Sequence, residues 1–321
     1  MSTPTWVDII LDSPSPTDAW NGVFTRLGEI AVSCGSPVDL HNQTVAPDRL
    51  LAETAWELWT SYPNAARRTS SQLREWCAAP SSIGRAVLVL DALSLREMPW
   101  LLGGAQARNI QPSDVRVTGA EAPSDTDQFA RALGVPSRSH LAGNGAPGSF
   151  NLFPSKAYTD VISVPFEDGV GRIPHESNVF VWHSWLDDLI HVHKLPDQIY
   201  KAASTTLQDD GFWKFVNRLR QGRKLIITSD HGYAVSKLFS REEIDPEVIE
   251  KLRETFGAAR YKKANDPWQE RFMPPIVVNH NEHHVVMGQR KWKVQGGFPP
   301  VCHGGLSLLE VAVPFIELPP I

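Results

Sequence analysis

The chain has 321 residues, of which 42% are hydrophobic and 21% are charged. Its 31 Lys and Arg residues against 36 Asp and Glu residues give a formal net charge of −5 at pH 7. These values are typical of a globular protein and exclude a disordered tail protein, a collagen-like chain and a coiled coil. The acidic balance also argues against coating nucleic acid by bulk charge, because such domains are usually strongly basic.

Targeting signals are absent from the sequence pattern. No apolar run reaches the ~18 residues that a membrane span needs. The N-terminal Met-Ser-Thr-Pro-Thr-Trp lacks the basic start and apolar stretch of a signal peptide. Three cysteines, Cys34, Cys77 and Cys302, are too few and too scattered for a disulfide framework. We therefore expect a cytoplasmic protein.

Residues 1–80 show the spacing of amphipathic helices, with apolar side chains at intervals of three and four. We predict helices from Ser15 to about Gly35, over Asp48–Tyr62, and from the potential caps Ser70 and Ser71 to Pro80. Nothing in this stretch indicates chemistry. The prediction is a helical N-terminal region over 1–80, followed by a second domain over 81–321.

The pattern changes after residue 85, where short runs that are apolar on both faces predict buried parallel strands. The predicted strands are 86–90, 114–118, 178–182 and 224–228, with a hairpin-like pair at 276–278 and 285–287 and a strand-like end within 306–318. The predicted helices are 93–103, 125–133, 185–192, 196–222 and 245–256, and 134–158 reads as a long loop. Alternating strands and helices predict an α/β fold with a mostly parallel sheet.

Acidic and imidazole side chains follow several of these strands, where ligands of open α/β sheets bind. They are Asp91, Asp187, Asp188, His191, Asp230, His231 and, before the last strand, His303. Each has an ordinary alternative: Asp91 as a helix cap, Asp230 in a turn, Asp187 and His191 as a surface pair. Together, carboxylate and imidazole suit Zn²⁺ or Mn²⁺ better than Ca²⁺ or Mg²⁺, and they suffice for two metal ions.

Three segments carry a resemblance to the alkaline phosphatase superfamily and, within it, to PglZ-type domains of bacterial phage-defence and signalling proteins. They are Val87–Leu93, Ile227–Gly232 and His303–Pro314, and the segment Gly288–Phe298 is also similar. The resemblance covers about residues 85–318. It implies a three-layer sandwich with a mostly parallel central sheet.

The resemblance also implies two divalent metal ions, Zn²⁺ with Mn²⁺ as the alternative. One set of ligands would be Asp91, Asp230 and His231, and the other Asp187, His191 and His303. The Asp-x-x-x-His spacing favours Asp187 over Asp188.

The nucleophile implied by the resemblance lies in the segment Pro123-Ser124-Asp125-Thr126. Its second hydroxyl, Thr126, is the predicted nucleophile, Ser124 is the alternative, and either hydroxyl has the simpler reading of a helix cap. Asp125 and Asp127, which flank Thr126, depart from the usual pattern because they place negative charge beside an anionic substrate. Arg96 and Arg131 are candidate substrate-binding residues.

The function implied is a two-metal phosphodiesterase acting on nucleotide or oligonucleotide phosphodiesters in a bacterial phage-defence system, with possible protein partners and no membrane. The alternative is a weak or inactive PglZ-type interaction module of a defence complex. A sulfatase is disfavoured because no Cys or Ser stands in a Cys/Ser-x-Pro-x-Arg context.

Other suggestive segments have ordinary interpretations. We interpret His280–His284 as a hairpin turn rather than a metal cluster, and the basic segments Lys262-Lys263 and Arg290–Lys293 as solvated strand faces rather than a nucleic-acid surface. Cys302, beside His303, is expected to be a half-buried small residue.

Overall fold

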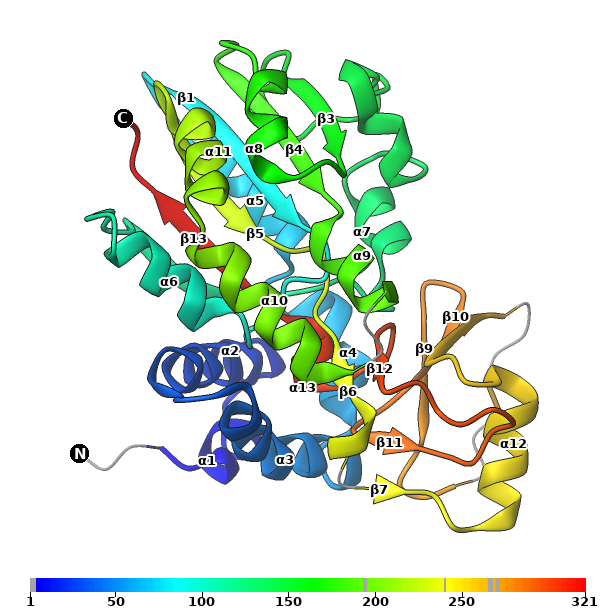
Figure 1. The fold of residues 1–321 in the computed structure, drawn as a ribbon. Helices are drawn as coiled ribbons and strands as arrows, with labels where there is room; N and C mark the ends of the chain where they lie inside the picture. The colour runs from blue at the N-terminus through cyan, green and yellow to red at the C-terminus, as the bar shows by residue number, and fades with distance from the viewer. Residues whose placement is uncertain (1–3, 193–194, 240, 265–267, 270–271) are drawn as a thin grey trace.

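The computed structural model describes residues 4–192, 195–239, 241–264, 268–269 and 272–321 (Figure 1). Its first five helices are α1 (Trp6–Ile10), α2 (Pro16–Ser33), α3 (Pro37–Glu53), α4 (Glu57–Ala65) and α5 (Thr69–Ala78). As predicted, Ser15 begins α2: its hydroxyl accepts the N–H of Asp18 at 3.2 Å, and Pro16 takes the first helical position.

The predicted helix over Asp48–Tyr62 is wrong in its bounds. The chain forms α3 and α4 instead, because Ser36 followed by Pro37 starts a helix earlier, with the Ser36 hydroxyl accepting the N–H of Asp39 at 3.1 Å. Ser70 is not a cap either. It lies inside α5, and its buried hydroxyl donates to Glu121 at 2.5 Å.

The central sheet has six strands in the order β2-β13-β5-β1-β4-β3. The strands are β1 (Gly84–Leu90), β2 (Asp114–Gly119), β3 (Tyr158–Ile162), β4 (Asn178–His183), β5 (Arg223–Thr228) and β13 (Ala312–Leu318). β13 runs antiparallel to β5 and β2, whereas β1 pairs in parallel with β4 and β5, and β3 with β4. The predicted α/β class with a mostly parallel central sheet is confirmed.

Helices cover both faces of this sheet, so the fold has three layers (Figure 1). One core contains sheet residues such as Leu88, Val181 and Ile227 together with side chains of α2, α6 (Met98–Gln106), α10 (Pro196–Gln208) and α11 (Asp210–Arg220). The other contains Val89 and Trp182 with side chains of α5 and α7 (Thr126–Ala132). The central strands are buried on both faces, and successive side chains point to opposite faces, so each strand contributes to both cores.

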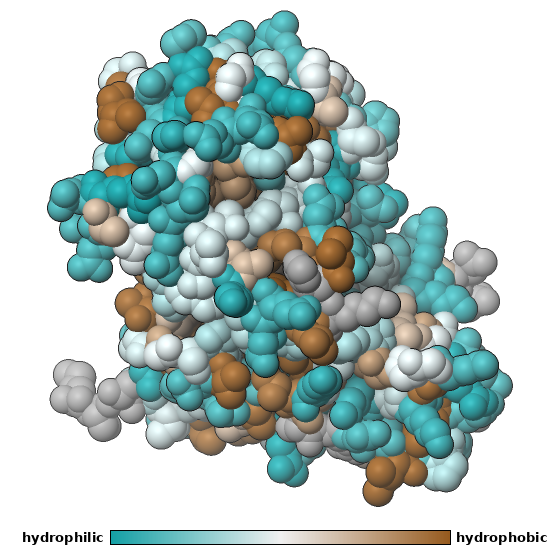
Figure 2. Space-filling view, viewed as in Figure 1, coloured by the Kyte–Doolittle hydropathy of each residue, from teal (hydrophilic) through white to brown (hydrophobic). Residues whose placement is uncertain are grey.

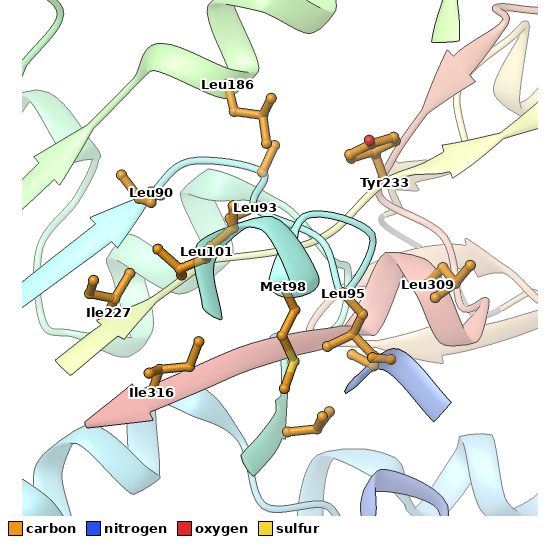
Figure 3. Close-up of a cluster of buried hydrophobic side chains, with 14 of the residues drawn as sticks. Leu90, Leu93, Leu95, Met98, Leu101, Leu186, Ile227, Tyr233, Leu309 and Ile316 are labelled. Atoms are coloured by element: carbon orange, nitrogen blue, oxygen red, sulfur yellow. The ribbon is translucent and has the colours of Figure 1, made fainter. Parts of the chain in front are cut away.

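Part of the first core lies directly below the end of β1. Figure 3 shows Leu90, Ile227 and Ile316 from three strands of the sheet beside Leu93, Met98 and Leu101. The helix predicted to begin at residue 93 begins at Met98 instead, and residues 93–97 form a buried turn. This packing fixes the backbone that follows β1.

Two further predicted elements differ from the structure. The helix predicted over 196–222 is two helices, α10 and α11, because Asp209 caps α11 by accepting the N–H of Gly211. The predicted loop over 134–158 contains a 3-10 segment, η1 (Arg138–Asn144), and its last residue already belongs to β3, a strand that was not predicted. β3 is short and interrupted by the polar Asp160, so it lacks a continuous apolar run.

A smaller sheet, β8-β10-β9, stands beside the main one and packs with α12 (Pro246–Phe256) (Figure 1). Its strands are β8 (Tyr261–Lys263), β9 (Val277–His280) and β10 (His283–Val286). β9 and β10 confirm the predicted hairpin, whose turn residues Asn281 and Glu282 both have positive φ, 47° and 61°. Positive φ at both central positions is the geometry that favours tight hairpins.

The remaining elements are short connections around the sheets. They are α8 (Phe166–Gly169), η2 (Val170–Arg172), α9 (Trp185–Val192), β6 (Ala234–Val235), η3 (Ser236–Leu238), β7 (Arg241–Glu242), β11 (Arg290–Lys291), β12 (Val301–Cys302) and α13 (Leu308–Val311).

The N-terminal helices meet the C-terminal part of the chain through a buried carboxylate on α3. Asp48 accepts the N–H of Leu308 and a side-chain N–H of Gln289, each at 2.7 Å. Burial raises the pKa of Asp48 to about 7. The division of the chain at residue 80 stays a prediction, although α2 and the sheet share one core.

In the described part of the chain, no helix is both long and apolar enough to cross a membrane. The face shown in Figure 2 is mainly hydrophilic, with apolar residues in small groups between the polar ones.

Candidate active site and metal centre

Three buried side chains meet where β1 and β5 end. Asp91 directly follows β1, and Asp230 and His231 lie two and three residues beyond Thr228, the last residue of β5. All three are fully buried. One ligand atom from each lies within 4.8 Å of the others. The parallel pairing of β1 with β5 brings these segments together, as expected for the carboxyl ends of neighbouring parallel strands.

The hydroxyl of Thr126 lies at the centre of this group. Thr126 is the first residue of α7, and its Oγ1 is 2.8 Å from Asp230 Oδ2 and 3.3 Å from His231 Nε2. The same oxygen is 3.4 Å from Asp91 Oδ1. Thr126 is half-buried, whereas its three neighbours are fully buried.

In each of these side chains, one polar atom is hydrogen-bonded to the surrounding protein and the other faces the centre of the group. His231 Nδ1 lies 2.9 Å from the carbonyl oxygen of Gly232, which assigns the proton to Nδ1 and the lone pair to Nε2. Asp230 Oδ1 accepts the N–H of Ala92 at 3.0 Å and the hydroxyl of Ser229 at 3.2 Å.

Asp91 is oriented in the same way. Its Oδ2 accepts the indole N–H of Trp182 at 3.1 Å and an N–H of the Arg138 guanidinium. Its Oδ1 therefore faces Thr126 and, at 3.8 Å, His231 Nε2. Neither Arg138 nor Trp182 was identified from the sequence. Trp182 lies near the end of a predicted strand, and Arg138 lies in a loop whose only signal was its length.

This arrangement fits a divalent cation. Three acceptor atoms point at one space: Asp91 Oδ1, Asp230 Oδ2 and His231 Nε2. The Thr126 hydroxyl offers a single proton there, so it can satisfy only one of the three lone pairs. Buried lone pairs without compensating positive charge are costly, and two carboxylates with one imidazole suit Zn²⁺ or Mn²⁺. In the protein alone, burial is the largest single influence on His231 and lowers its pKa. The charges of Asp230, Asp125 and Asp187 and the hydrogen bond to the Gly232 carbonyl together outweigh burial and raise the pKa overall.

His303 lies at the edge of the centre. Its ring stacks on that of His231 with 4.4 Å between centroids, and its Nδ1, which has no hydrogen-bond partner, is 4.0 Å from Asp125 Oδ2. Burial, together with the charge of His231, lowers the pKa of His303, and nearby carboxylates including Asp187 oppose this.

The residues predicted for a second metal site are only partly brought together. Asp187 lies close enough to His231 and His303 for its charge to act on both. His191 Nε2 is 3.5 Å from Asp187 Oδ1, but the His191 side chain is 69% exposed. Within the described residues, Asp187, His191 and His303 do not form a group of three converging ligand atoms.

Three other candidates lie elsewhere. Ser124 is buried, donates to the carbonyl of Gly305 at 2.8 Å and accepts the N–H of Gly304 at 3.1 Å, so it ties down the loop that carries His303. Arg96 is buried against Tyr233, whose carbonyl it contacts at 2.5 Å. Arg131 is exposed on α7.

A cavity of about 580 Å³ opens beside His303. Its walls are mainly small or apolar residues, and they comprise Ile190, His191, Ala258–Tyr261 and Gly296–His303. Cys302, which lines the cavity, is buried, and burial raises the pKa of its thiol to about 12. Burial of this small residue agrees with its expected packing role.

The histidines around the β9–β10 turn serve the fold. His280 contacts the carbonyl oxygen of Trp59 at 2.8 Å, and His283 that of Asn281 at 2.6 Å. The interpretation of this segment as a hairpin turn is confirmed.

No protein-family model matches the chain. No curated protein matches it in sequence. Matching solved structures include phosphonoacetate hydrolase from Sinorhizobium meliloti 1021 in complex with phosphonoformate, at TM-score 0.41 and 14% identity over 73% of this chain and 89% of that one. They also include murine ectonucleotide pyrophosphatase/phosphodiesterase 5, at TM-score 0.43 and 14% identity over 74% and 88%. An inactive form of the murine protein in complex with AMP matches at TM-score 0.42 and 13% identity over 74% and 88%.

The likeness is distant, so the chemistry rests on the geometry of the site itself. The resemblance to PglZ-type domains stays a prediction.

Proposed function

We propose that this protein is a metal-dependent phosphoesterase in which Thr126 is the nucleophile. The observation that carries the proposal is the Thr126 hydroxyl within 2.8–3.4 Å of Asp91, Asp230 and His231, which are fully buried and converge on one point. A half-buried alcohol surrounded by a buried cation-binding set is suited to attack a phosphate ester.

Each side chain has a defined task in this mechanism. The Thr126 hydroxyl, which donates to Asp230 Oδ2 at 2.8 Å in the cation-free protein, releases its proton to solvent as its oxygen bonds to phosphorus and the bond to the leaving group breaks. Water then hydrolyses the phosphothreonine and restores the hydroxyl. When bound, a cation at Asp91, Asp230 and His231 lowers the pKa of the alcohol and offsets charge on the phosphoryl oxygens. The contacts of the outer atoms with Ala92, Gly232 and Trp182 keep these groups in place.

We further propose that a second cation binds at Asp187, His191 and His303. The proximity of Asp187 to His303 and the unpartnered Nδ1 of His303 support this set. His191 would have to turn inward from its exposed position. We therefore expect one tight cation site and a weaker second one.

We propose phosphodiesters of nucleotides or oligonucleotides as the substrates. The cavity beside His303 supports this, since about 580 Å³ accommodates a nucleoside-sized group with mainly uncharged surroundings. A role in phage defence follows only from the sequence resemblance.

A second candidate function is a catalytically weak interaction module. The observation that favours it is the pair of carboxylates flanking Thr126: Asp125 is largely buried and caps α7, and Asp127 is exposed beside it. Both place negative charge next to the site of an anionic substrate.

Metal analysis and hydrolysis of bis-p-nitrophenyl phosphate separate these two functions. We expect bound Zn²⁺ or Mn²⁺ and turnover that EDTA removes and the metal restores. Thr126→Ala should reduce turnover by about 10³-fold or more, whereas Thr205→Ala, at an exposed position of α10, should not. Full activity of Thr126→Ala would refute the nucleophile, and no turnover of any phosphoester by metal-loaded protein would support the module.

A further inference from the structure

Arg138 is a cation that reaches the centre from a separate part of the chain. It is the first residue of η1, and its guanidinium forms an ion pair with Asp91 Oδ2. Its side chain is 27% exposed, whereas that of Asp91 is fully buried, so the guanidinium extends from the surface to the centre. In the described part of the chain, no other Lys or Arg contacts Asp91, Asp230, His231 or Thr126.

The backbone that carries Arg138 is fixed, so its side chain is the part free to move. Asp160 of β3 accepts the N–H of Gly143 at 2.8 Å, and Asn144 accepts the N–H of Thr159 at 3.3 Å. Leu141 is buried in the core beneath the sheet. An arginine side chain on such an anchor has enough rotatable bonds to reorient without unfolding the loop.

The two oxygens of Asp91 serve two different positive groups. Oδ2 contacts Arg138, while Oδ1 faces Thr126 and His231, where the cation of the proposed function would bind. A guanidinium and a divalent cation on one carboxylate repel each other across its width. Occupation of the centre therefore weakens the hold of Asp91 on Arg138.

We propose that Arg138 is a switching residue that forms an anion subsite for the substrate phosphate. In the cation-free protein it neutralises Asp91. With the cation bound, it turns to a non-bridging oxygen of the phosphoryl group at Thr126, which lies only one carboxylate width away. The planar guanidinium fork suits phosphate oxygens better than an ammonium does. This inference rests on the proposed function and adds to it the residue that recognises the phosphate.

Binding measurements test the switch without relying on turnover. Isothermal titration of Mn²⁺ into Arg138→Gln should show affinity about tenfold higher than wild type, because the competing charge is gone. Inorganic phosphate should bind the Mn²⁺-loaded variant about tenfold more weakly, and Arg138→Lys should restore part of that loss. Arg172→Gln, at an exposed position of η2, is the matched control and should leave both affinities unchanged.

Each outcome decides the inference. Unchanged or weaker Mn²⁺ affinity in Arg138→Gln overturns the competition, and unchanged phosphate affinity overturns the subsite. If Arg138→Gln does not fold, the test passes to Arg138→Lys. Phosphate binding by Arg138→Lys as tight as in wild type would refute the claim that the guanidinium of Arg138 holds the phosphate. Failure of wild type to bind Mn²⁺ overturns both proposals. Full activity of Thr126→Ala removes the nucleophile but leaves the switch standing if the two affinities respond.

Discussion

The neutral form of His183, at the end of β4, should make the protein lose stability as pH falls. Its ring stacks on Phe166 at 4.0 Å, Nε2 is 3.1 Å from the carbonyl of Val164, and Nδ1 accepts the N–H of Trp185 at 3.2 Å. Both nitrogens are thus satisfied by a ring protonated on Nε2 alone. A second proton, on Nδ1, would break this hydrogen bond and face the N–H of Trp185.

The magnitude follows from the pKa. Burial lowers the pKa of His183 from 6.5 to about 4, although the carbonyl of Val164 opposes it. Because the folded pKa is depressed, the stabilising effect is complete above pH 6.5 and is lost as pH falls through 6.5 toward 4. On going from pH 8 to pH 5, protonation of this histidine in the unfolded chain should lower the free energy of unfolding by about 2 kcal/mol.

Urea unfolding of wild type and His183→Phe at pH 8 and pH 5 measures this directly. Phe keeps the stacking ring but cannot make the two hydrogen bonds of His183, so the variant should be less stable than wild type at pH 8. Because Phe does not titrate, the free energy of unfolding of the variant should fall by about 2 kcal/mol less than that of wild type between pH 8 and pH 5. Other groups titrate equally in both proteins and cancel in the difference. Parallel losses in the two proteins would show that His183 is not held neutral and refute the reasoning.

Three further predictions concern the surroundings of the site. Arg260→Met breaks a fully buried bidentate pair with Glu310 and should lower the free energy of unfolding by about 3–5 kcal/mol in urea titrations, with Arg260→Met/Glu310→Leu recovering part of the loss; equal stability of single variant and wild type would contradict this. Gly304→Ala should lower Tm and cation affinity more than Gly297→Ala, because both have positive φ, 94° and 88°, but only at 304 would the new Cβ lie 2.3 Å from Tyr261; equal effects would exclude the clash. Val301→Trp should narrow the cavity and raise the KM for the p-nitrophenyl ester of thymidine 5′-monophosphate about tenfold relative to that for p-nitrophenyl methyl phosphate, with Val32→Trp, at an exposed position of α2, as control. A parallel change in both KM values would show that the nucleoside does not bind in this cavity.

The predictable part of the site consists of residues whose position follows from strand ends. Asp91, Asp230 and His231 directly follow apolar runs, and parallel pairing leaves their backbone little choice of place. Thr126 came from a motif resemblance, and the structure places its hydroxyl among them. Their catalytic and metal-binding roles stay predictions until measured.

The parts that escaped prediction depend on tertiary contacts. Arg138 lies in a loop without periodicity, and only the anchoring of η1 by Asp160 brings it to Asp91. Ser36-Pro37 is a typical helix start, but the prediction followed the apolar spacing of later residues and placed the helix from Asp48. Arg96 was predicted as a candidate substrate-binding cation, but the buried turn after β1 directs it to the carbonyl of Tyr233.

The hydrogen bonds of Asp48 have a consequence for any truncation of the N-terminal helices. Its carboxylate, on a helix near the beginning, holds the backbone of Leu308 just beyond the loop of His303. A version of the chain without that helix would leave the buried N–H of Leu308 without its hydrogen-bond acceptor. Removal of the leading helices would therefore also loosen the backbone that follows the loop of His303.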